Sequence, residues 1–190
     1  MLRLPAALER KLQQLFPKSI DRTQFVVDLI EAALAARPES DIEGEQVVGG
    51  TLHLFTDGGS RGNPGQAAIG IVLEDPSQGK VIREHYERIG IGTNNVAEYR
   101  ALIEGLKLAK RYHPNRLICH LDSELIVRQV NGSYKVKMPT LQPLFDEIRA
   151  LSQDFREVAF VHIPRIDNHR ADALVNRALD EHPAPHYEKP

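Results

Sequence analysis

The 190-residue chain has a single cysteine, no tryptophan and no long apolar run. Because Cys119 cannot form a disulfide within the chain, a reducing, cytoplasmic setting is expected. A membrane span needs roughly 18 consecutive apolar residues, and the apolar segment around residues 25–30 is interrupted by Asp28. The N-terminus also lacks the basic and apolar regions of a signal peptide. These absences argue against a membrane protein and against a secreted protein held together by disulfides.

The chain also lacks a strong charge of either sign, with 24 basic and 26 acidic residues, a net charge of −2 and an isoelectric point near 6.4. Any binding to nucleic acid would therefore depend on local patches or metal ions and not on an overall basic field. Hydrophobic residues make up 42% of the chain and charged residues 26%, the balance of an ordinary globular protein.

The composition changes once along the chain, near residue 37. Residues 37–50 (RPESDIEGEQVVGG) are rich in acids and end in two glycines, which is typical of a solvated linker. We therefore expect a small segment at 1–36, an acidic linker at 37–50, a domain of ordinary size at 51–182 and a short tail at 183–190.

Within 51–182, apolar periodicity predicts an alternation of strands and helices. Strands are expected near residues 52–55, 67–73, 80–88, 117–121 and 158–163. Helices are expected near residues 96–112, 123–130, 141–151 and 168–179. The order βββαβααβα indicates an α/β fold with a five-stranded mixed sheet flanked by helices.

Four acidic residues fall where such a fold brings ligands together. Asp57 and Asp122 are expected at the C-terminal ends of the first and fourth strands, where α/β sheets bind ligands. Glu98 and Asp172 are expected in the first turns of the first long helix and the last helix. Such acids also serve as ordinary turn and helix-terminus residues. If all four converge, their repulsion calls for a hard cation such as Mg²⁺, and two such ions could hydrolyse a phosphodiester.

The residues around these acids resemble the motifs of type 1 ribonucleases H, in the short-loop form found in archaea and many bacteria. Four segments carry the resemblance, in the order of the family: residues 56–65 (TDGGSRGNPG), 93–99 (TNNVAEY), 122–135 (DSELIVRQVNGSYK) and 168–174 (NHRADAL). They span about residues 51–180. The resemblance implies a ribonuclease H-like fold and an endonuclease that hydrolyses the RNA strand of RNA–DNA hybrids.

The resemblance also implies roles for the four acids as ligands of two Mg²⁺ ions, for which Mn²⁺ may substitute. Asp57 would hold both ions, Asp172 would share the ion that activates water, and Glu98 with Asp122 would hold the ion near the leaving 3′-oxygen. The products would carry 5′-phosphate and 3′-hydroxyl ends.

The same resemblance implies a surface that reads the hybrid. Asn63 and Thr93 match positions that hold a phosphate of the DNA strand. The backbone of the turn Gly59–Ser60–Arg61, with Asn95 and Glu98, matches positions that contact RNA 2′-hydroxyls, and Asn94 is expected among the residues that bind the substrate. Glycines suit this role because they let backbone approach the minor groove closely.

The chain departs from the commonest family pattern ahead of the last helix, where many members have a mobile histidine loop. Here His162 is expected on the last strand, and Arg165 occupies the loop as a candidate catalytic group that binds phosphate or assists product release. His169 is expected on the surface of the last helix. A basic, tryptophan-rich protrusion is also missing, and Lys135 and Lys137 are the nearest local substitute.

Residues 1–36 predict a short strand followed by two helices, the second with an apolar stripe from Phe25 to Leu34. This pattern is similar to a ribbon-helix-helix module, which would form a homodimer and contact DNA. A simple amphipathic helical hairpin explains the pattern as well.

Two other functions remain open at this point. A non-catalytic nucleic-acid-binding protein could share the fold, but it would not need four repelling acids. A two-metal nuclease that cuts DNA junctions is the other alternative, and the Asp-Gly-Gly-Ser and Thr-Asn-Asn motifs favour the RNA-cutting branch.

Overall fold

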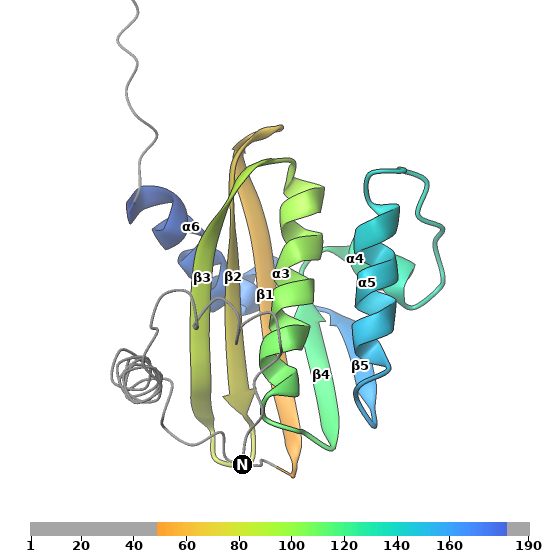
Figure 1. The fold of residues 1–190 in the computed structure, drawn as a ribbon. Helices are drawn as coiled ribbons and strands as arrows, with labels where there is room; N and C mark the ends of the chain where they lie inside the picture. Colours follow the sequence, from red (N-terminus) through yellow and green to blue (C-terminus); the bar gives the residue numbers. More distant parts are fainter. Residues whose placement is uncertain (1–48, 182–190) are drawn as a thin grey trace, which may run out of the picture. The chain divides into compact units, whose positions relative to one another are not determined.

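A computed structural model describes residues 49–181 (Figure 1). The predictions made for residues 1–36, for most of the linker and for the tail at 183–190 lie outside the described residues and stay predictions. None of the helices within 49–181 is long and apolar enough to cross a membrane.

A five-stranded mixed sheet forms the centre of the domain, with the strand order β3-β2-β1-β4-β5. The strands are β1 (Thr51–Gly62), β2 (Gly65–Asp75), β3 (Lys80–Gly92), β4 (Arg116–Leu121) and β5 (Val158–His162). The first three strands are antiparallel neighbours, whereas β4 lies parallel to both β1 and β5. The central strand β1 is therefore paired on both sides, and it carries the first acidic motif.

Helices cover the two faces of the sheet (Figure 1). They are α3 (Asn94–Lys110), α4 (Glu124–Val130), α5 (Gln142–Ser152), the short 3₁₀ helix η2 (Arg165–Asn168) and α6 (His169–Glu181). Helix α3 packs on β1 and β2 from one side, with α5 beside it, and α6 packs on the same strands from the other.

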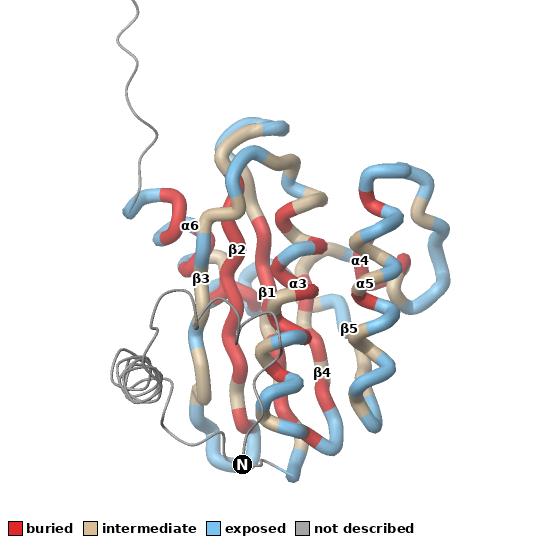
Figure 2. Tube along the Cα trace, in the orientation of Figure 1, coloured by how far each residue is buried: buried red, intermediate tan, exposed pale blue. Residues whose placement is uncertain are grey.

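The main core lies between the sheet and α3, and Figure 2 shows buried residues concentrated along the central strands and the inner side of this helix. In β1, Leu52 and Leu54 are fully buried, while the intervening His53 is only partly buried. This alternation is what a strand produces when one face meets a core. The buried leucines anchor β1 in the core just before Asp57.

The predicted order βββαβααβα is confirmed, but two of the acids occupy different positions in their elements from those expected. Asp57 does not end β1, because the strand continues to Gly62 in antiparallel pairing with β2. The parallel pairing of β1 with β4 does end there, at Thr56 opposite Leu121. Glu98 lies one turn deeper in α3 than expected, because the helix already begins at Asn94.

Candidate active site

Two glycines allow helices to approach the sheet very closely beside Asp57. A Cβ atom at Gly58 would lie 2.2 Å from the backbone carbon of Ala97 on α3. A Cβ atom at Gly70, the β2 partner of Asp57, would lie 2.2 Å from the carbonyl oxygen of Ala171 on α6. Real Cβ atoms do not tolerate such distances, so only glycine permits this packing. The helices that carry Glu98 and Asp172 are thereby brought against β1 at the level of Asp57.

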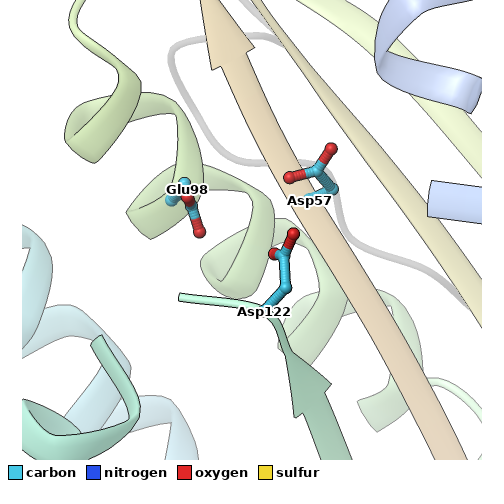
Figure 3. Close-up of side chains that lie close together, drawn as sticks. All are labelled: Asp57, Glu98 and Asp122. Carbon is cyan, nitrogen blue, oxygen red and sulfur yellow. The ribbon is translucent and has the colours of Figure 1, made fainter. Parts of the chain in front are cut away.

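Three carboxylates from three different elements meet at this point. Asp57 comes from β1, Glu98 from α3, and Asp122 directly follows the last residue of β4. Each offers an oxygen, and these oxygens all lie within 4.8 Å of one another. Figure 3 shows the three side chains pointing into the same space. Three hard oxygen donors at such distances can hold a divalent cation.

Burial and mutual repulsion raise the pKa values of two carboxyl groups in this cluster. Loss of hydration, with the neighbouring charges of Asp122 and Asp172, raises the pKa of Asp57 to about 6. Loss of hydration, with the charges of Asp57 and Asp122, raises the pKa of Glu98 to about 8, although a hydrogen bond from Ser123 opposes this. The charged forms therefore need a compensating cation.

Asp172 lies near this group but is not among the three whose oxygens converge. Its Oδ1 accepts a hydrogen bond of 2.5 Å from the guanidinium of Arg165, and its Oδ2 accepts one of 3.0 Å from Asn176 Nδ2. The pairing raises the pKa of Arg165 further above its usual value. Its charge still reaches Asp57, where it contributes to the raised pKa. The fourth acid is thus already compensated by side chains of the protein.

The residues expected to read the hybrid lie mainly where the β1–β2 hairpin meets the start of α3. The backbone N–H and the hydroxyl of Ser60 both donate to Asn94 Oδ1, each at 2.8 Å. The backbone N–H of Asn94 donates to Asn63 Oδ1 at 3.3 Å. Thr93 caps α3, because its hydroxyl accepts from the N–H of Val96. These bonds tie the hairpin and the helix terminus into one surface.

The remaining members of the predicted set are placed differently. Gly59 lies on β1 between Asp57 and this surface, and Asn95 lies in the first turn of α3. The side chain of Arg61 instead forms an ion pair with Asp180 near the end of α6, together with a hydrogen bond to the Leu179 carbonyl. Arg61 therefore braces the hairpin against α6.

Other candidates lie on exposed parts of the domain. His162 is exposed at the end of β5, as expected, while His169 Nδ1 lies 3.1 Å from the carbonyl oxygen of Ile166. Tyr134 is 48% exposed, and Arg128 stacks over its ring at 5.1 Å from the centroid. Lys135 and Lys137 are exposed in the same loop.

Three polar residues bordering the acids had no role assigned from the sequence. Ser123 hydrogen-bonds Glu98, Asn168 hydrogen-bonds Asp122, and Asn176 hydrogen-bonds Asp172. Each lies one or four residues from an acidic motif position, and that spacing is the signal that could have found them.

Comparison with known proteins finds relatives that match most of the described residues. The family model described as reverse transcriptase-like matches residues 55–178. Ribonuclease HI of Halobacterium salinarum is 41% identical over 133 residues, covering 70% of this chain and 66% of that protein. The crystal structure of RNase H1 from that archaeon has a TM-score of 0.68 and 40% identity, and the match covers 70% of this chain and all of the other. The chain belongs to the ribonuclease H family.

Two further relatives add detail to the ribonuclease H assignment. A bifunctional protein of Mycobacterium tuberculosis is 44% identical over 127 residues, which are 67% of this chain and 35% of that protein. The chain thus spans about a third of this relative and about two thirds of the archaeal one. The structure of LC11-RNase H1 in complex with RNA/DNA hybrid has a TM-score of 0.65 and 45% identity, and the match covers 68% of this chain and 97% of that one.

Proposed function

We propose that this protein is an endonuclease that hydrolyses the RNA strand of RNA–DNA hybrids with the help of divalent metal ions. The observation that carries the proposal is the convergence of Asp57, Glu98 and Asp122 from three elements of a ribonuclease H fold. The similar LC11-RNase H1, whose structure contains an RNA/DNA hybrid, supports the substrate class.

The donor set suits a hard cation, because all three convergent ligands are carboxylate oxygens and no nitrogen or sulfur ligand belongs to the group. Asp57, Glu98 and Asp122, together with Asp172 once it is released from Arg165, would hold two Mg²⁺ ions, for which Mn²⁺ could substitute. When bound, the ions supply the positive charge that makes a water acidic and stabilises the leaving 3′-oxygen.

The protein's own residues would position the substrate around this charge. Asp172, released from Arg165, would help to hold the ion that makes the attacking water acidic, on the side of α6. The side chain of Arg165 is 77% exposed, so its guanidinium can turn toward a phosphate. The planar pair of donors on the guanidinium suits a phosphate well. We therefore assign Arg165 to phosphate contact or product release.

Recognition of the hybrid would fall to the surface that joins the hairpin to α3. Asn63 and Thr93 would hold a phosphate of the DNA strand beside the N-terminus of α3, which favours anions. The backbone of Gly59, Ser60 and Arg61, with Asn94 and Asn95, would contact RNA 2′-hydroxyls, the groups that distinguish RNA from DNA. Selection would then depend on the shape of the hybrid and not on base identity.

The test uses the full chain with a labelled RNA–DNA hybrid, an RNA duplex, a DNA duplex and a DNA four-way junction, each with Mg²⁺ or EDTA. We expect Mg²⁺-dependent cleavage of the RNA strand of the hybrid. Binding without cleavage would favour the non-catalytic alternative, and cleavage of the junction alone would favour the junction nuclease. Either result would overturn the proposal.

A cytoplasmic location belongs to the proposal, on the strength of the single cysteine. The homodimer and the DNA contact predicted for residues 1–36 also stay part of it. Light scattering of the full chain at micromolar concentration tests the dimer, and a monomer would leave the helical-hairpin interpretation of that segment.

A further inference from the structure

Asn168 is a buried polar residue between the acid-bearing elements. It ends η2, directly before α6, and only 1% of its surface is exposed. Its side-chain Nδ2 donates one hydrogen bond of 3.0 Å to the Thr56 carbonyl oxygen and another of 3.3 Å to Asp122 Oδ1. Thr56 immediately precedes Asp57 on β1. One amide group therefore links the backbone beside the first acid to the carboxylate of another.

These two acceptors determine which way the amide points. A rotated amide would place its oxygen against the Thr56 carbonyl and the Asp122 carboxylate, where it would be repelled by both. In the observed orientation the amide oxygen, Asn168 Oδ1, is buried and has no partner among the described residues. Burying an unpaired acceptor costs free energy. In exchange for this cost, the amide nitrogen of Asn168 keeps both of its hydrogen bonds, to Asp122 and to the Thr56 carbonyl of β1.

We propose that Asn168 is a positioning residue for metal binding, which holds the Asp122 carboxylate in place relative to β1 and Asp57. The inference rests on the proposed function of the acid cluster as a metal site. Without the bond from Asn168, the Asp122 side chain, which follows the end of β4, would be free to rotate. Groups that hold a metal ligand by hydrogen bonds typically change metal affinity or activity by about 10–100-fold when removed.

The protein contains a matched control for the effect of losing a buried hydrogen bond. Tyr99 on α3 is fully buried, and its hydroxyl donates to Gln129 Oε1 on α4 at 2.7 Å. Because burial raises the pKa of Tyr99 to about 12, this phenol stays protonated and acts as the donor. The bond joins two helices and includes none of the acids. Tyr99→Phe removes it with little change in volume.

The experiment measures Mn²⁺ binding to the full chain by the electron paramagnetic resonance signal of free Mn²⁺, with no nucleic acid present. Wild type, Asn168→Ala, Asn168→Leu and Tyr99→Phe are compared well below their melting temperatures, and each melting temperature is recorded. Asn168→Leu keeps the branched shape and the number of heavy atoms of the side chain, so it fills the space that alanine would leave empty. Hybrid cleavage is then measured for the same four proteins.

We expect both Asn168 variants to bind Mn²⁺ about 10–100-fold more weakly, and to lose kcat with little change in KM for the hybrid. Tyr99→Phe should lower the melting temperature while keeping Mn²⁺ affinity within about twofold, since the hydroxyl that it removes bonds to Gln129 and to none of the acids. Wild-type affinity in both Asn168 variants, or an equal loss of affinity in Tyr99→Phe, would overturn the inference. If wild type itself bound no Mn²⁺, the proposed function would fail together with it.

Discussion

The two sides of the acidic site solve the problem of buried negative charge differently. On the α3 side, Asp57, Glu98 and Asp122 face one another, and the pKa values of Asp57 and Glu98 are strongly raised. On the α6 side, Asp172 is paired with the guanidinium of Arg165 and the amide of Asn176. The three convergent carboxylates need a cation from outside the protein, whereas Asp172 is already paired with the cationic side chain of Arg165.

This difference indicates a division of labour between the two sides. Carboxylates that form no ion pair with a basic side chain of the described residues are poised to bind metal ions, because binding relieves their repulsion. A carboxylate that is already paired must exchange its partner before it can take part. Because the Arg165 side chain is mostly exposed, that exchange is inexpensive in free energy, as for other exposed ion pairs. The comparison therefore makes separate predictions for the two sides.

The largest effect is expected from Asp57→Asn, which removes the charge at the centre of the convergent group. We expect the rate of hybrid cleavage to fall roughly a thousandfold, equivalent to about 4 kcal/mol of transition-state stabilisation. Circular dichroism should show an intact fold, because the amide has the same shape as the carboxyl. Near-normal turnover by this variant would show that the convergent group is not the catalytic centre.

A second prediction concerns stability in EDTA. The folded-state pKa values of Asp57 and Glu98, about 6 and about 8, lie above the ordinary values of 3.8 and 4.5. Their protonated forms therefore favour folding at low pH. This contribution is lost progressively as the pH rises from the ordinary to the raised pKa of each group, by about pH 6 for Asp57 and about pH 8 for Glu98. Wild type should become less stable over this range.

In Asp57→Asn, one of the two groups no longer titrates and the repulsion on the other is reduced. Relative to wild type in EDTA, the variant should gain about 2–3 kcal/mol of unfolding free energy between pH 4 and pH 8. Thermal unfolding at several pH values measures this, and saturating Mg²⁺ should abolish or reverse the gain. A constant difference between the two proteins across the range would refute the electrostatic account of the cluster.

The smallest effect is expected on the α6 side. Arg165→Ala should lower kcat by about tenfold with a smaller change in KM, because it removes a contact to phosphate and not a metal ligand. His162→Ala should change both constants by less than about twofold, since this histidine is exposed at the end of β5. Steady-state kinetics on one hybrid substrate measures both variants. A larger loss of kcat in His162→Ala than in Arg165→Ala would transfer the proposed role to His162.

Much of the fold could be predicted from the chain, because apolar periodicity reports which face of each element meets the core. The extent of β1 could not, since Gly-Gly-Ser-Arg-Gly after Asp57 has the composition of a turn. Antiparallel pairing with β2 holds that segment extended through Gly62. This is a tertiary effect, and local composition does not contain it.

The acids themselves could be singled out from their motifs, but their pairing could not. Whether Asp172 joins the others depends on where η2 places Arg165, seven residues earlier in the chain, and on the Asn176 amide one turn later. The link from Asn168 to both Thr56 and Asp122 joins residues more than forty positions apart. Such contacts exist only after the sheet and α6 have packed.

The chemistry of the cleaved ends tests the central claim most directly. The full chain is incubated with Mg²⁺ and a hybrid whose RNA strand is labelled, and the products are separated beside standards for each type of end. Hydrolysis by water activated at the acidic site predicts 5′-phosphate and 3′-hydroxyl ends from wild type and almost no product from Asp57→Asn. Ends with 2′,3′-cyclic phosphate and 5′-hydroxyl, or equal product from the variant, would contradict the account.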